Sequence, residues 1–280
     1  RNITIWTEAG KIKYKAPAGA LTSEELQCIK ENKEKIIKPI AYIRTEFPSK
    51  FGIPRQSSLK NELFGTIVFE PEYCHEEAFR ELKGFSHLWI IWHFSETEKD
   101  EPSLTVRPPR LGGNRRVGVF ASRSPYRPNS LGLSCVKLEK ICSDRKSCSI
   151  PHCPLGKKLC KKQNGISLLV SGIDMMDKTP IFDIKPYIPI TDCHTEASEG
   201  YTAITQKHTL SVILPENIDT VIPSEKLSRL ISVLEDDPRP GYRHSEKDSD
   251  KTYHIEFDMY DIPFKVKEDS LIVLDNIKIN

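Results

Sequence analysis

The chain has 280 residues, 38% of them hydrophobic, which allows one substantial core and a second, smaller lobe. Its formal net charge is only +2, and its most apolar stretch, residues 85–94, is too short to span a bilayer, so we expect a cytoplasmic chain without membrane spans. With no visible export signal, the eight cysteines are expected to be thiols or metal ligands rather than a disulfide framework.

Residues 22–37 have the pattern of one amphipathic helix. Thr22 and Glu25 form a Thr-x-x-Glu capping box, and Leu26, Ile29 and Ile36 follow at roughly helical spacing. We therefore interpret residues 1–37 as an N-terminal helical extension.

From Lys38 the chain consists of short apolar runs separated by proline and glycine, a pattern typical of an antiparallel sheet or barrel. The predicted strands are residues 40–43, 66–69, 88–94, 117–121, 133–138, 167–173 and 181–184. Residues 76–82 are predicted to form a short helix between two of them. Residues 38–200 are therefore expected to fold as a mainly β domain around a small antiparallel β-barrel.

Residues 142–164 are polar and rich in lysine and cysteine, and we interpret them as an insertion in a hairpin connection. Cys142, Cys148, Cys153, Cys160 and His152 are enough ligands for a tetrahedral zinc site. However, the spacing lacks a tight Cys-x-x-Cys knuckle, so free thiols are the preferred interpretation and no metal is predicted.

The pattern changes again after Tyr201. A helix is predicted at residues 224–234, a loop rich in proline and aspartate at 236–242, and strands at 253–257 and 264–266. Residues 201–280 are therefore expected to form a small α+β C-terminal lobe.

Residues 104–129 contain six arginines and no acidic residue. Guanidinium groups bind phosphate and carboxylate through paired hydrogen bonds, so Arg110, Arg123, Arg127 and Asn129 are candidates for anion binding. A solvated basic loop is the alternative, but the spacing of Arg123 and Arg127 is fixed by prolines, which favours function.

Asp183, Lys185 and Tyr187 alternate along a predicted strand, which places them on one face. A catalytic role and an ordinary cross-strand ion pair agree equally well with this spacing. His87, at the start of another predicted strand, is interpreted as a core histidine whose ring has a hydrogen-bond partner.

Several segments, in their order along the chain, resemble the tRNA threonylcarbamoyladenosine N6-methyltransferase family. They are residues 51–56, 85–89, 107–114, 118–129, 132–134, 174–180 and 183–187. The resemblance covers residues 38–192 and recurs at 236–242 and 251–253. It implies an S-adenosylmethionine-dependent enzyme built on a small β-barrel that acts on tRNA beside the anticodon. The absence of a Gly-x-Gly-x-x-Gly segment agrees with a barrel rather than a Rossmann domain.

The resemblance also implies roles for individual residues. The implied cofactor site consists of Pro54, Arg55, Gln56, Ser95, Glu96, Arg123, Leu133, Ser171, Gly172, Ile173 and Asp174. Ser95 and Glu96 stand where the family usually has a His-Gln pair, and Lys178 replaces the usual turn glycine. The expected contacts to the anticodon loop are Arg110, Arg127, Asn129, Lys185, Arg239, Tyr242, Lys251 and Tyr253. For the lobe, an alternative stays open: it only braces the barrel, with Pro238 and Pro240 fixing a turn and Asp237 paired locally with Arg239.

Methyl transfer from a sulfonium requires positioning of the acceptor and exclusion of water. A base that removes the N6 proton would help, and Asp183, Tyr187 and Asp237 are the candidates. Two alternatives stay open: a barrel enzyme that methylates another RNA base or a protein, and a non-enzymatic RNA-binding adaptor. A homodimer is expected, because the resemblance implies one and because an open barrel leaves strand edges for a partner to cover.

Overall fold

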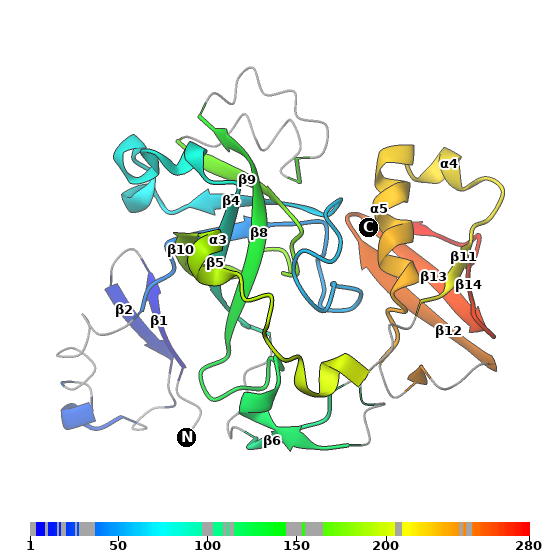
Figure 1. Ribbon diagram of the computed structural model, residues 1–280, viewed down its shortest axis with the longest axis horizontal. Helices are drawn as coiled ribbons and strands as arrows, with labels where there is room; N and C mark the ends of the chain where they lie inside the picture. The colour runs from blue at the N-terminus through cyan, green and yellow to red at the C-terminus, as the bar shows by residue number, and fades with distance from the viewer. Residues whose placement is uncertain are drawn as a thin grey trace. The chain divides into compact units, whose positions relative to one another are not determined.

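The structure is a computed structural model of the 280-residue chain (Figure 1). It describes residues 4–8, 11–15, 17, 21–25, 27, 37–96, 103–108, 111, 115–143, 153–154, 165–204, 209–240, 243–244 and 248–280. The chain divides into two compact units, Arg1–Pro39 and Ile40–Asn280, and each is described separately.

The first unit contains a β-hairpin that the sequence pattern did not predict. Strands β1 (Thr4–Glu8) and β2 (Lys11–Lys15) pair antiparallel. The predicted capping box is present: the Thr22 backbone N–H donates to Glu25 Oε2 at 2.7 Å, and the Glu25 N–H donates to Thr22 Oγ1 at 3.1 Å. Residues 26 and 28–36, which carry most of the predicted helix, lie outside the described residues.

The second unit begins with a closed, six-stranded antiparallel barrel, which confirms the predicted mainly β fold. The strands follow one another around the barrel in the order β10–β3–β4–β9–β8–β5 (Figure 1). Their bounds are β3 Ala41–Arg44, β4 Phe64–Phe69, β5 His87–His93, β8 Leu131–Cys142, β9 Ser167–Ser171 and β10 Pro180–Pro186. Because the barrel is closed, the expectation of open strand edges is wrong.

Side chains alternate between the inside and the outside of the barrel. On β5, Leu88, Ile90 and Trp92 are buried, while the residues between them are half-buried. His87 is one of these outward residues, so its interpretation as a core histidine is wrong, although Ser86 Oγ lies 2.9 Å from its Nδ1.

The strand and helix predicted in the connections between barrel strands are shorter and less regular in the structure. Strand β7 (Val117–Gly118) pairs with β6 (Thr105–Val106) and then becomes a 3₁₀ turn at Val119–Ala121. The predicted helix at residues 76–82 is instead a series of 3₁₀ turns, with bounds Pro71–Tyr73, Glu76–Phe79 and Leu82–Gly84. The left-handed backbone of Glu81, with φ of 65°, prevents these turns from continuing as one helix.

The C-terminal lobe combines a mixed sheet with a helix, as predicted. Helix α5 (Ser224–Glu235) contributes buried leucines to the core. The sheet order is β11–β14–β13–β12, in which β11 is parallel to β14, and β15 pairs with β13. The remaining bounds are α3 Pro189–Asp192, 3₁₀ Gly200–Ile204, β11 Ser211–Ile213, α4 Ile218–Val221, β12 Asp248–Phe257, β13 Tyr260–Lys267, β14 Ser270–Val273 and β15 Lys278–Ile279.

A buried ion pair joins the lobe to the barrel domain. Arg229 of α5 donates to both carboxylate oxygens of Glu46, at 2.8 and 2.6 Å. Both side chains are less than a tenth exposed, and the Asp258 backbone N–H donates to the Glu46 carbonyl at 2.7 Å. Removing one partner of such a pair would cost about 3–5 kcal/mol, because the other charge would stay buried.

Membrane-spanning helices and a metal site can be assessed only for the described part of the chain. Within the described ranges, no helix has the length and apolar character needed to cross a membrane. Cys153 Sγ lies 3.4 Å from Thr66 Oγ1, and no group of three His, Cys, Asp or Glu side chains with metal-binding geometry occurs among the described residues. Cys148, His152 and Cys160 of the insertion lie outside them.

Candidate functional site

The loop that carries Pro54, Arg55 and Gln56 is fixed to two barrel strands just beyond Gln56. Ser58 Oγ donates to the Cys135 carbonyl at 2.8 Å, and the Cys135 N–H donates to Ser57 Oγ at 3.1 Å. The Ser58 N–H also donates to the Gly172 carbonyl at 2.8 Å. These bonds bring loop 54–58 against β8 and the end of β9, where most of the expected cofactor residues lie.

Arg123 reaches this loop from the arginine-rich segment. Its Nη1 donates to Gln56 Oε1 at 2.5 Å, and Gln56 Nε2 donates to the Arg55 carbonyl at 2.6 Å. The structure thus brings together three of the residues that were predicted to bind the cofactor. Since Arg123 is exposed, its guanidinium is accessible to an anionic group of a ligand.

A half-buried carboxylate lies beside this group. Asp174 Oδ1 accepts a hydrogen bond from Ser134 Oγ at 2.6 Å, and Ser134 Oγ accepts one from Trp92 Nε1 at 2.9 Å. Burial raises the pKa of Asp174 to about 6, although hydrogen bonds from Ser134 and the Ser57 backbone and the charge of Arg123 act in the opposite direction. We call Gln56, Arg123, Ser134 and Asp174 the Arg123–Asp174 cluster.

The other expected cofactor residues differ in their burial and in their hydrogen bonds. Leu133 is 60% exposed on β8, and Pro54 is buried. Ser171 and Ile173 are buried, and Ser171 Oγ donates to Glu139 Oε1 at 2.6 Å. Ser95 and Glu96 are exposed just after β5 and have no hydrogen bond in the structure to the cluster.

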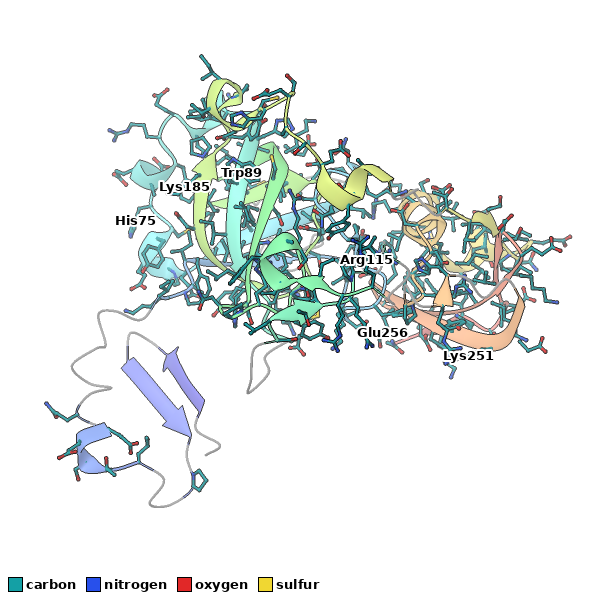
Figure 2. The ribbon with its side chains drawn as sticks, turned by 60° about the horizontal axis from the view of Figure 1, so that its bottom comes forward. His75, Trp89, Arg115, Lys185, Lys251 and Glu256 are labelled. Carbon is teal, nitrogen blue, oxygen red and sulfur yellow. The ribbon has the colours of Figure 1, made fainter. Side chains whose placement is uncertain are left out.

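The outer face of the barrel carries two of the candidate catalytic residues. Trp89 pairs with Cys135 on one side and with Lys185 on the other, so the three residues form a row across β8, β5 and β10. Trp89 and Lys185 lie on the same side of the barrel in Figure 2. Lys185 Nζ lies 3.0 Å from Asp183 Oδ2, an ion pair within β10 rather than the cross-strand pair considered as the alternative.

Tyr187 lies next to an aromatic side chain that is held firmly in place. The rings of Tyr187 and Trp89 are 5.7 Å apart and tilted. Trp89 Nε1 donates to Asp192 Oδ2 at 2.8 Å, and the same carboxylate oxygen accepts the Ile188 N–H at 3.0 Å. The hydrogen bond from the Ile188 N–H, followed by that from the Trp89 indole, lowers the pKa of Asp192. The short helix α3 is thereby fastened to the outer face of β5.

Asp237, the third candidate base, is fully buried in an internal ion pair. Arg239 donates to its two oxygens at 2.9 and 2.8 Å, and both side chains are at most 1% exposed. Burial favours a higher pKa for Asp237, but the bonds from Arg239 and the charge of His244 outweigh it and lower the pKa. Arg239 is therefore committed to a carboxylate of its own chain.

The remaining predicted RNA contacts are spread over two regions. Arg127 Nη1 donates to the Ser122 and Val119 carbonyls at 2.7 and 3.3 Å and stabilises its own loop, whereas Asn129 is exposed. In the lobe, Lys251 is exposed with its Nζ 5.2 Å from the centre of the buried Tyr253 ring. Arg110 and Tyr242 lie outside the described residues.

Sequence reasoning did not identify several residues that hold the site together. Ser57 and Ser58 directly follow Gln56, and Ser134 follows Leu133, so the neighbouring positions were a usable signal. His244 is different, because its Nε2 lies 3.1 Å from Arg55 Nη2, a residue 189 positions away. No local pattern reveals such a contact.

Comparison with protein families assigns three segments. Residues 42–193, more than half of the chain, match the tRNA-methyltransferase O N-terminal domain, and residues 208–278 match the TrmO C-terminal domain. Residues 1–39 match the TubC N-terminal docking domain. The Arg123–Asp174 cluster and the outer face of β5 and β10 both lie within the first match.

Individual relatives cover most of the chain. The tRNA (adenine(37)-N6)-methyltransferase of Escherichia coli K12 is 34% identical over 235 residues, which are 82% of this chain and 92% of that protein. A Pseudomonas aeruginosa protein described as "Putative S-adenosylmethionine-dependent methyltransferase RcsF" is 41% identical over 59% of this chain and 62% of its own length. The crystal structure of TrmO from P. aeruginosa superimposes with a TM-score of 0.63 and 27% identity, over 88% of this chain and 97% of that chain.

Proposed function

Since the chain belongs to the tRNA-methyltransferase O family, we propose that it is an S-adenosylmethionine-dependent enzyme that methylates N6 of adenosine 37 in tRNA. The acceptor is the threonylcarbamoylated form of that adenosine, beside the anticodon. The observation that carries the proposal is that the family match extends over both lobes of the second unit and includes the Arg123–Asp174 cluster.

The cluster has the chemistry that the cofactor requires. S-adenosylmethionine supplies an activated methyl group when bound, and it presents one carboxylate, one ammonium group and ribose hydroxyls. Arg123, exposed and aligned by Gln56, provides the cation for the carboxylate. Asp174, held by Ser134, provides an acceptor for the ammonium or hydroxyl groups. Leu133 offers apolar surface beside them.

The acceptor nitrogen then has to approach from the outer face of the barrel. The row Cys135–Trp89–Lys185 begins at loop 54–58 and ends beside Asp183 and Tyr187, so a base stacked there would lie between cofactor and proton acceptor. We propose Asp183 as the group that removes the N6 proton, with Tyr187 lining the site. For Asp237 we propose a positioning role, because Arg239 already occupies its carboxylate.

The RNA backbone would be bound by basic side chains on the same unit. Lys185, Arg110 and Arg127 would supply positive charge for the phosphates, and Asn129 would supply a neutral amide for hydrogen bonds. Lys251 and Tyr242 of the lobe would extend this surface, and the buried Tyr253 ring would support the Lys251 side chain. A tRNA substrate also implies the compartment where tRNA is used, which we propose to be the cytoplasm.

A methylation assay with matched RNAs tests the proposal. The purified chain is incubated with S-adenosylmethionine and either tRNA that carries threonylcarbamoyladenosine or the same tRNA without this modification, and nucleosides are analysed by mass spectrometry. We expect one added methyl group on threonylcarbamoyladenosine only. Methylation of the unmodified tRNA or of a protein would support a different acceptor, and RNA binding without cofactor binding would support an adaptor.

The first unit favours a second, additional function. We propose that Arg1–Pro39 attaches the enzyme to a partner protein, because this unit is compact by itself and matches a docking domain. Deleting residues 1–39 should leave methylation of tRNA unchanged in vitro. Loss of cofactor binding in the truncated enzyme would contradict this role and make the unit part of the methyltransferase.

We also propose that the enzyme is a homodimer. Two large apolar side chains that flank β6 and β7 are exposed, Leu104 at 76% and Phe120 at 79%, and the Val119 N–H, next to Phe120, donates to the Leu104 carbonyl. Exposed apolar side chains of this size are typical of surfaces that a partner covers.

A further inference from the structure

His244 lies in the C-terminal lobe and faces loop 54–58. Its Nε2 is 3.1 Å from Arg55 Nη2 on one side and 3.0 Å from the Arg239 carbonyl oxygen on the other. The Asp237 carboxylate is 3.7 Å away, and the His244 side chain is 15% exposed. A single ring nitrogen therefore faces a donor, an acceptor and a negative charge.

The lobe side of this arrangement is rigid. The Asp237 and Arg239 side chains are buried and joined by two hydrogen bonds, and the Arg239 backbone N–H also donates to Asp237 Oδ1 at 3.2 Å. Asp237 adopts a left-handed backbone conformation, with φ of 49°. A non-glycine residue persists in this conformation only where the surrounding contacts hold it. The Arg239 carbonyl therefore stays in a fixed position beside His244.

The two close contacts of Nε2 exclude each other chemically. A guanidinium N–H can only donate and a carbonyl oxygen can only accept. Nε2 without a proton accepts from Arg55 but cannot donate to Arg239. In the imidazolium, which has a proton on each ring nitrogen, Nε2 donates to the Arg239 carbonyl, and the positive ring is attracted by Asp237 and repels the Arg55 guanidinium.

We propose that His244 is a positioning residue for the cofactor site, and that a proton on its Nε2 releases Arg55. In the unprotonated state, His244 accepts from Arg55 and holds loop 54–58 against the lobe; in the protonated state, this link is lost. The inference rests on the proposed function, because it takes Arg55–Arg123 as the cofactor site.

The link continues from Arg55 to Arg123 through two further bonds. Gln56 donates to the Arg55 carbonyl, and Arg123 donates to Gln56. Release of Arg55 therefore loosens the alignment of the arginine that would bind the cofactor carboxylate. Among the described residues, the charged groups that face His244 include Arg55 from the loop and Asp237 and Arg239 from the lobe, with Arg243 preceding it in the chain.

Calorimetric titration with S-adenosylmethionine between about pH 5 and pH 8, where histidine titrates, tests the proposal. In the wild-type protein, affinity should fall on acidification. His244→Gln should bind as tightly as the wild type does at neutral pH and lose this fall, because an amide accepts from Arg55 and donates to the Arg239 carbonyl at any pH. His244→Ala should bind about tenfold more weakly throughout.

Asp174 is the main confounding group, since its pKa of about 6 also affects cofactor affinity on acidification. It is present in both wild type and His244→Gln, so the difference between their pH profiles isolates His244. Identical profiles would overturn the proposal. Absence of cofactor binding at every pH would instead overturn the proposed function itself.

A measurement on the unaltered protein removes the dependence on variants. If protonation of His244 weakens cofactor binding, then cofactor binding must lower the pKa of His244 by the same free energy. Nitrogen NMR of the histidine rings during a pH titration, with and without saturating S-adenosylmethionine, reports this pKa and the tautomer. We expect a lower pKa and an unprotonated Nε2 in the bound protein. An unchanged pKa would refute the coupling.

Discussion

At the scale of single residues, the site depends on two charges of opposite sign that lie in different environments. Arg123 is exposed and aligned by one amide, whereas Asp174 is half-buried beneath it and bonded to Ser134. Burial raises the pKa of the Asp174 carboxylate to about 6, so this group loses its negative charge as the pH falls below that value. Cofactor affinity should therefore respond to each of them differently.

Replacing Arg123 by alanine should weaken S-adenosylmethionine binding by at least about tenfold, because a charge-assisted hydrogen bond to the cofactor carboxylate is lost. Calorimetry measures the affinity directly. Arg115→Ala is the matched control, since Arg115 is exposed in the same arginine-rich segment but has no contact with Gln56 in the structure. Equal affinities of the two variants would remove Arg123 from the site.

The raised pKa of Asp174 leads to a prediction for stability. The folded state holds the proton more tightly than the unfolded chain, so the free energy of unfolding falls as pH rises from 3.8 to about 6. Asp174→Asn removes this loss and should be more stable than wild type at pH 7 by about 1–3 kcal/mol, with no gain at acidic pH. Urea unfolding at several pH values measures it.

The control for this comparison is Glu77→Gln, which changes an exposed carboxylate on a 3₁₀ turn and should not alter the pH profile. Cofactor affinity of Asp174→Asn should fall even as stability rises. A variant that is less stable than wild type at pH 7 would show that the Asp174 carboxylate contributes net stabilisation instead.

At the scale of elements, the sequence pattern predicted the regular strands but not the irregular segments. Strands β4, β5, β9 and β10 are close to their predicted bounds, because each combines apolar residues with proline or glycine punctuation. The hairpin β1–β2 and the turns at 71–84 were missed. Their conformations depend on local backbone geometry, such as positive φ at Glu81, that composition does not report.

The site was predictable to the same extent. Cofactor loop, arginine-rich segment and strand β10 were located because each is a contiguous motif. The local pair of Asp237 and Arg239 was foreseen as an alternative and is present. The contact between Arg55 and His244 was not foreseen, since it depends on how the lobe packs against the barrel domain. Pairing partners that are distant in sequence leave no trace in the local pattern of one chain.

Gly132 on β8 supports the cluster through its missing side chain. A Cβ atom there would lie 2.3 Å from the Trp92 ring, which packs against Phe94 at 4.2 Å and donates to Ser134. Gly132→Ala should lower stability by about 1–3 kcal/mol through overpacking and should also weaken cofactor binding. In Gly118→Ala a Cβ would meet nothing within 4 Å, so neither quantity should change.

Thermal unfolding and calorimetry on both glycine variants provide the measurement. Equal effects in Gly132→Ala and Gly118→Ala would mean that the Trp92 ring moves aside at no cost. That result would also mean that the position of the Trp92 ring does not determine the alignment of Ser134 and Asp174.

At the scale of the whole molecule, the proposed homodimer predicts a particle of twice 32.0 kDa in light scattering. Phe120→Ser should shift the equilibrium toward monomer, because Phe120 is 79% exposed in the monomer. Ile279→Ser, at a 64% exposed apolar position near the C-terminus, serves as control and should leave the mass unchanged. A wild-type mass of 32.0 kDa at working concentration would contradict the proposal.

The closure of the barrel by β10 has a consequence for the order in which a growing chain acquires its structure. Strand β10 pairs with β5 and, through Pro180 and Ile181, with β3, so it is the last barrel strand in the chain and closes the barrel between β3 and β5. Until it has left the ribosome, β3 and β5 have unsatisfied edges that invite pairing with other chains. We therefore expect the nascent chain to be most prone to wrong strand pairing until residues 180–186 have emerged, and slower translation of this region would prolong that interval.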